Sequence, residues 1–235
     1  MRRIVVGVGL AFLMSSVASA GDPKGPWDGF GAGSWVHMKS TTKMEMPGMP
    51  SMPDNVSEMK QVLTKVTDDA WTVKYEVKQG ESWTTSTEMN IPRKATGPVG
   101  GPAAKVEDLG TESVSVDGKD YSCKKTRAVA GDATVVVWTH ADLGALKSES
   151  SSPTGGSSTM QVTSLSKKAK VGDKEVECHE TKVTTKGSVE STMVSLTSDA
   201  VPGHQVRMET TSNTAGMKTS MVTEVVAIEV KEPRG

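Results

Sequence analysis

The sequence predicts an all-β protein, an antiparallel sheet curved into a half-barrel or clamshell and built from repeated β-meander units. Apolar and polar residues alternate along short runs, without a break over residues 71–77. Turn signals such as Asp117-Gly118 and Val201-Pro202-Gly203 separate the runs. Aromatic residues make up only 4% of the chain, so the core must consist largely of Val, Met, Leu and Thr.

The first 20 residues predict an export signal. Arg2 and Arg3 precede an apolar run over 4–14, and Ala18 and Ala20 match an A-x-A cleavage pattern. The run is too short to span a bilayer, which needs ~20 apolar residues. We therefore expect cleavage before Gly21 and an exported product, periplasmic or extracellular, with no transmembrane span.

Two stretches of the mature chain resemble one another. Residues 116–126 and 171–181 both read V-x-x-K-[acid]-x-x-C-x-x-T, with their cysteines 55 positions apart. Such self-similarity indicates repeated structural units. We expect a divergent N-terminal β unit at 21–91, a Pro/Gly-rich linker or loop at 92–110, a first β repeat at 111–166 and a second at 167–235.

Two local segments carry sequence signals of their own. Residues 54–66 fit either a capped helix or a strand, and their similarity to 217–225 favours a strand. Residues 148–158 are rich in Ser, Gly and Pro, which predicts the tip of a hairpin.

The charge pattern gives no sign of a nucleic-acid partner. The chain has 27 Lys and Arg and 28 Asp and Glu, a formal net charge of −1, with both signs interspersed. A nucleic-acid-binding domain gathers its basic residues on one face or stretch. We expect no nucleic-acid partner.

No arrangement typical of catalysis is recognisable. The histidines lack the spacing of a zinc site; they are His37, His140, His179 and His204. A strand would send the adjacent Cys178 and His179 to opposite faces. We expect no cofactor and no enzyme, while a histidine–acid pair in a cavity would favour a hydrolase.

Two sets of sulfur-containing residues are candidate sites. Cys123 and Cys178 occupy matching repeat positions, and are either two small buried residues or a disulfide that an oxidising compartment permits. A Met-rich stretch is either a hairpin tip that fills gaps at the end of the sheet or a Cu(I) site, since thioethers select Cu(I). Its methionines are Met44, Met46, Met49 and Met52.

The stretch P-W-D-G-F-G-A-G-S-W-V at 26–36 resembles the mature start of uncharacterised secreted bacterial, planctomycete-like proteins. Residues 116–149 and 171–209 resemble their later units, with departures at Leu196 and at Leu143-Gly144-Ala145. That family has no assigned activity, so the resemblance implies no site residues. The architecture is similar to the half-open sheets of lipoprotein carriers, which implies acyl chains held on a concave face.

These observations lead to one main functional hypothesis and one alternative. We expect a non-enzymatic exported protein that binds an apolar ligand or an envelope partner on the curved sheet. The alternative is extracytoplasmic Cu(I) binding by the loop at 44–52.

Overall fold

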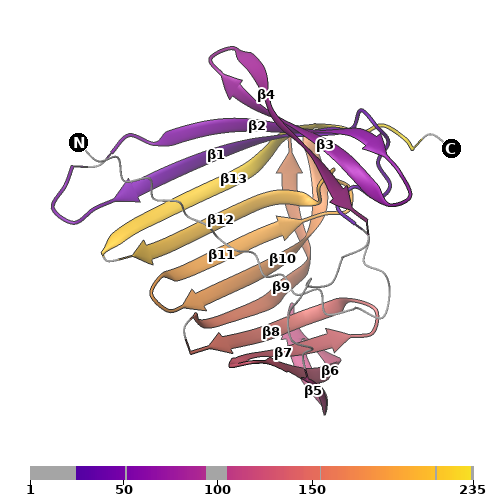
Figure 1. The fold of residues 1–235 in the computed structure, drawn as a ribbon, viewed down its shortest axis with the longest axis vertical. Coiled ribbons are helices and arrows are strands. Elements are labelled where there is room, and N and C mark those ends of the chain that lie inside the picture. Colours follow the sequence, from indigo (N-terminus) through magenta and orange to yellow (C-terminus); the bar gives the residue numbers. More distant parts are fainter. Residues whose placement is uncertain (1–24, 51, 94–104, 154, 215, 234–235) are drawn as a thin grey trace.

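The computed structural model describes residues 25–50, 52–93, 105–153, 155–214 and 216–233. These residues form thirteen antiparallel strands in one open, curved sheet, with no helix among them (Figure 1). The all-β prediction is confirmed. The predicted export signal at 1–20 and residues 94–104 of the predicted loop lie outside the described residues.

The strands follow one another along the chain with short connections. Their bounds are β1 (Trp35–Glu45), β2 (Asn55–Val66), β3 (Ala70–Gln79), β4 (Ser82–Pro92), β5 (Lys105–Val116), β6 (Lys119–Ala130), β7 (Ala133–His140), β8 (Gly144–Ser152), β9 (Gly156–Val171), β10 (Lys174–Lys186), β11 (Glu190–Thr197), β12 (Gln205–Thr214) and β13 (Met217–Glu229).

Two meanders join to make the sheet. Strands β5 to β13 lie side by side in chain order, and so do β1 to β4. The pairing of β1 with β13, from Trp35 opposite Glu229 to Glu45 opposite Lys218, connects the two runs. The predicted N-terminal unit is therefore a continuation of the same sheet, and β4 and β5 form its two edges.

The local predictions hold except at the linker. Residues 55–66 form strand β2, as expected, and the predicted hairpin tip contains the turn between β8 and β9. The predicted loop at 92–110 is wrong at its end, because β5 begins at Lys105. Gly110 lies within this strand, with φ +85 at an irregularity of the β5–β6 pairing between Asp108 and Thr111, a conformation that glycine adopts without strain.

Both hairpins that carry the cysteine motif arch over the strands that follow them. The β9–β10 turn reaches β13, and a Cβ on Gly172 would lie 3.5 Å from the carbonyl oxygen of Val226. The β5–β6 turn reaches β9, where the carboxylate of Asp117 accepts a hydrogen bond of 2.8 Å from the amide of Leu165. Each arch crosses two strands, because β11 and β12, or β7 and β8, lie between.

The core consists of two clusters, and each contains residues of one of these two hairpins. The larger contains Trp27, Phe30, Val36, Met38, Leu63, Trp71, Val73, Val171, Cys178, Leu196, Val201, Val206 and Val225. The smaller contains Val114, Val116, Cys123, Trp138, Leu146 and Val162. Val, Leu and Trp thus supply most of the two clusters, as expected for Val and Leu. Met38 is the one Met among their buried members and no Thr is among them, so the expectation for Thr is wrong.

The N-terminal loop at 25–34 is tied to three other parts of the chain. The amide of Gly31 donates to the carbonyl of Lys231, and that of Gly33 to the carbonyl of Leu63, both at 2.7 Å. The carbonyl of Pro26 accepts from the amide of Gly203 at 2.8 Å. These bonds hold Trp27 and Phe30 of the loop in the larger cluster.

The two cysteines are free and buried, and they belong to different clusters. Four strand spacings of ~4.8 Å separate β6 from β10, about 19 Å along the sheet. A disulfide needs Cα atoms within ~7 Å, so the disulfide alternative is wrong for this structure. Burial raises the pKa of both thiols, Cys123 and Cys178.

Candidate functional site

The charged side chains of the central strands lie on one face of the sheet. Directly opposed residues of neighbouring strands share a face, and successive residues alternate between faces. Met193 of β11 is opposite Thr210 of β12, whereas the next residue, Val194, is opposite Glu209 on the other face. The same alternation continues from β2 through β6 in sheet order.

On the opposite side of the sheet, the alternation also places Gln61, Lys124 and His179, toward one end of their strands. A stretch of that side across ten strands, here called the uncharged face, carries only Ser, Thr, Met, Val, Ala and Asn. Its members are Asn55, Ser57, Met59, Ser40, Thr42, Met44, Thr219, Met221, Thr223, Met208, Thr210, Ser212, Ser191, Met193, Ser195, Thr181, Val183, Thr185, Ser158, Met160, Ser148, Ser150, Ser152, Ala133, Val135, Val137, Thr126, Ala128 and Ala130.

Neighbouring side chains on the uncharged face bind one another. The hydroxyls of Ser40 and Thr223 share a hydrogen bond of 2.8 Å between β1 and β13. Thr185 of β10 donates to Ser158 of β9 at 3.4 Å. Because such pairs satisfy part of their hydrogen-bonding capacity within the protein, covering them costs less than covering unpaired hydroxyls.

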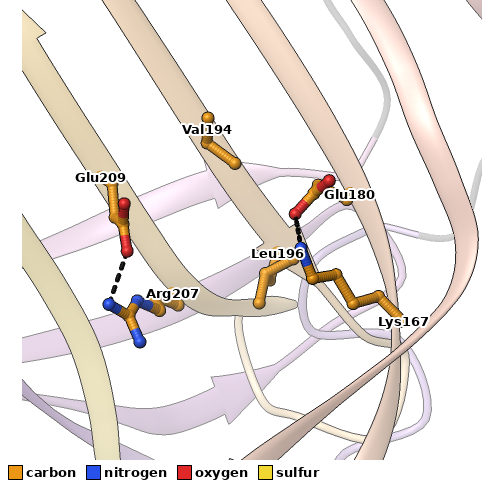
Figure 2. Close-up of a pocket in the computed structure, with 6 residues that line it drawn as sticks. All are labelled: Lys167, Glu180, Val194, Leu196, Arg207 and Glu209. Atoms are coloured by element: carbon orange, nitrogen blue, oxygen red, sulfur yellow. Dashed lines mark hydrogen bonds and ion pairs between the residues drawn. The ribbon is translucent and has the colours of Figure 1, made fainter.

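The charged face holds a shallow depression of about 210 Å³ between β9, β10, β11 and β12. Figure 2 shows Lys167 paired with Glu180 and Arg207 paired with Glu209, with Val194 and Leu196 between the pairs. Both cations and both carboxylates of the depression are therefore engaged within it. The depression offers paired charges rather than a reactive group.

The electrostatic surroundings of the Glu180 carboxylate suit an ion-pairing role rather than proton transfer. A hydrogen bond from Lys167 lowers the pKa of Glu180, and a bond from the Thr163 hydroxyl lowers it further. A carboxyl group with a lowered pKa stays ionised at neutral pH. It cannot then donate a proton as a general acid.

A histidine–acid pair does occur, on β1 and β2. His37 Nε2 lies 2.8 Å from Glu58 Oε2, and Lys78 donates to the same carboxylate at 3.0 and 3.1 Å. The Trp83 ring meets the His37 ring edge-on, with centroids 5.0 Å apart. The hydrogen bond from Lys78 is the largest cause of the lowered pKa of Glu58. The carboxylate therefore joins an ion network, and neither Glu58 nor His37 lines the depression.

The predicted Met-rich stretch forms the connection between β1 and β2. Three of its thioethers are well exposed: the fractions are 39% for Met44, 57% for Met49 and 39% for Met52. Met46 is half-buried. In the described parts of the chain, no group of three or more His, Cys, Asp or Glu side chains could hold a metal ion. Those parts also contain no helix suited to crossing a membrane.

Comparison with known proteins adds no family to this picture. No protein-family model matches the chain, and no curated protein is similar to it in sequence. The resemblance to secreted planctomycete-like proteins therefore stays a prediction.

Structure comparison finds two solved structures that align with most of this chain at low similarity. A DUF1329 family protein from Desulfovibrio piger has 9% identity and a TM-score of 0.31, over 85% of this chain and 86% of the other. A putative outer membrane lipoprotein-sorting protein domain from Vibrio parahaemolyticus has 13% identity and a TM-score of 0.29, over 88% of each chain. At these TM-scores the likeness carries no argument about function.

Sequence reasoning missed the uncharged face. Its signal was the position of the charges within each strand: Arg207 and Glu209 alternate with Met208 and Thr210, and Lys182 falls between Thr181 and Val183. One strand alone does not reveal the pattern. The register is needed to place all the uncharged residues on the same side.

Proposed function

We propose that this protein is an exported, non-enzymatic binding protein that holds an apolar ligand against its uncharged face. The absence of charged residues from this stretch of ten neighbouring strands is the observation that carries the proposal. An apolar surface of an envelope partner would meet the same requirements. The test below separates these two occupants.

The placement of charge favours an apolar occupant because covering an unpaired charge is very costly. An ionised group that loses water without gaining a partner costs several kcal/mol or more, whereas a hydroxyl costs about 1–3 kcal/mol. On the uncharged face, Met160, Met193, Met208 and Met221 add half-buried thioethers to the hydroxyl rows. Unbranched methionine side chains adapt to irregular apolar surfaces.

The expected affinity follows from the area that a ligand can cover. An acyl chain that lies on one sheet face and buries about 250 Å² of apolar surface gains roughly 6 kcal/mol. That free energy corresponds to a dissociation constant in the tens of micromolar. Assays should therefore span about 1–100 µM ligand.

The experiment uses delipidated protein and two probes, N-phenyl-1-naphthylamine and palmitate. We expect probe fluorescence to rise on binding, palmitate to displace the probe, and the melting temperature to rise with palmitate because a ligand of the folded state stabilises it. Lipid extracted from protein purified without delipidation should also be detected by mass spectrometry.

Two results would count against the ligand proposal. If neither probe bound at concentrations up to 100 µM, an apolar ligand of the proposed kind would be excluded. Probe binding without displacement by palmitate, together with capture of one envelope protein by the wild type, would assign the face to a partner instead.

A further inference from the structure

The connection between β1 and β2 contains a tight turn that brings two methionines together. The amide of Met49 donates to the carbonyl of Met46 at 3.2 Å, and Gly48 has φ +76. Pro at the second position and a left-handed Gly at the third are typical of a type II turn, whose ends lie within ~7 Å. Met46 and Met49 stand at those two ends.

A fifth methionine lies beside this turn, although it is distant in the sequence. The β1–β13 register ends with Glu45 opposite Lys218, so the next positions outward are Met46 and Met217. A Cβ on Gly216 would lie 3.7 Å from Cγ of Pro47, which places the β12–β13 turn against the loop. Met217 is 36% exposed.

The exposure of these side chains argues against a packing role. Methionines that fill gaps at the end of a sheet would be covered, yet Met44, Met49 and Met52 are 39–57% exposed. The nearby charges are engaged with each other: Lys43 pairs with Asp54 at 3.3 Å and Lys218 with Glu45 at 3.6 Å. The end of the sheet thus presents several thioethers as its available ligands.

We propose that Met44, Met46, Met49 and Met52, together with Met217 of the β12–β13 turn, bind Cu(I). Thioethers are soft, uncharged donors that select Cu(I), whereas Zn²⁺ in proteins takes Cys, His and carboxylate ligands. Thioethers also carry no proton to lose, so the affinity should not fall at mildly acidic pH. The two cysteines are buried in other parts of the fold and are not donors for this site.

The test is an anaerobic titration of the whole protein with Cu(I), kept reduced with ascorbate, in competition with bathocuproine disulfonate and with the weaker chelator bicinchoninate. We expect one Cu(I) per chain, with equal affinity at pH 5.5 and 7.5. The M46L/M49L variant should bind at least 10-fold more weakly, and M217L several-fold more weakly. Leu keeps the apolar volume of Met, so these variants should fold.

The matched control is M89L, because Met89 is 51% exposed on the edge strand β4 and does not belong to the loop. M89L should bind as the wild type does. Failure of the wild type to compete with either chelator would overturn the proposal. So would full affinity in a variant with Leu at all five positions, or an affinity that collapses at pH 5.5, as a thiolate site would show. None of these outcomes depends on whether the uncharged face binds a lipid.

Discussion

The Asp117 carboxylate joins two strands that are not neighbours in the sheet. Its Oδ2 accepts hydrogen bonds from the amide of Leu165 at 2.8 Å and from the hydroxyl of Ser164 at 3.2 Å. Asp117 also has φ +52, a left-handed conformation that Asp and Asn tolerate better than most residues. These contacts fix the end of the β5–β6 arch to β9.

Removing this contact should loosen the arch. We expect D117G to lower the free energy of unfolding by about 1–2 kcal/mol, because Gly suits the backbone but loses the acceptor. D117N keeps an oxygen acceptor and should lose less. Urea unfolding measures both, with D132A in the exposed β6–β7 turn as the control. Equal stability of D117G and the wild type would show that the arch does not need this bond.

A cavity in either core cluster should lower the free energy of unfolding. Leu63 and Leu146 are both fully buried, one in each cluster. L63A and L146A should each cost about 2–5 kcal/mol in unfolding free energy, whereas V106A, at a residue 68% exposed, should cost under ~0.5 kcal/mol. Calorimetry should show one transition, because a single sheet carries both clusters. A loss below ~1 kcal/mol for either Leu variant would contradict its place in the core.

The cysteines should behave as buried thiols. Cys123 is 0% and Cys178 is 1% exposed, and burial raises both pKa values, so little thiolate is available to react. We expect no rapid reaction with Ellman's reagent in the folded protein, and two thiols per chain after unfolding without reductant. No thiols after unfolding would instead reveal a disulfide.

Acid should weaken the ion pair on the charged face. The pKa of Glu180 is lower in the folded protein than in the unfolded chain. The contribution of the Lys167–Glu180 ion pair to stability is therefore complete above the unfolded carboxyl pKa of ~4.3, and it is lost as the pH falls through the folded pKa. Between pH 5 and 3 the wild type should therefore lose more unfolding free energy than E180Q. E81Q, in the exposed β3–β4 turn, should follow the wild type. Parallel pH profiles for E180Q and the wild type would refute the assignment.

Local patterns predicted most of the strands but not how they are placed. Alternation over 71–77 and the similarity of 54–66 to 217–225 were enough to identify β3 and β2, because period-two burial is a local property. The pairing of Trp35 with Glu229 joins the two ends of the chain, and no local pattern specifies such a partner.

The candidate site was predictable only in part. The Met-rich stretch was visible in the sequence, but Met217 becomes part of it only through the β1–β13 register. Cys123 and Cys178 occupy equivalent positions, which suggested a bond, whereas each arch folds over its own set of strands and keeps them apart. Both features depend on contacts between residues far apart in the sequence.

The most direct test of the central claim places charge on one face or the other of the same two strands. Met193 and Thr210 are directly opposed on the uncharged face, and Thr192 and Thr211 are directly opposed on the charged face. M193K/T210K should bind N-phenyl-1-naphthylamine and palmitate at least 10-fold more weakly than the wild type, because the ligand would have to cover two cations. T192K/T211K should change the affinity less than twofold. Equal losses in the two variants, or a larger loss in T192K/T211K, would contradict binding on the uncharged face.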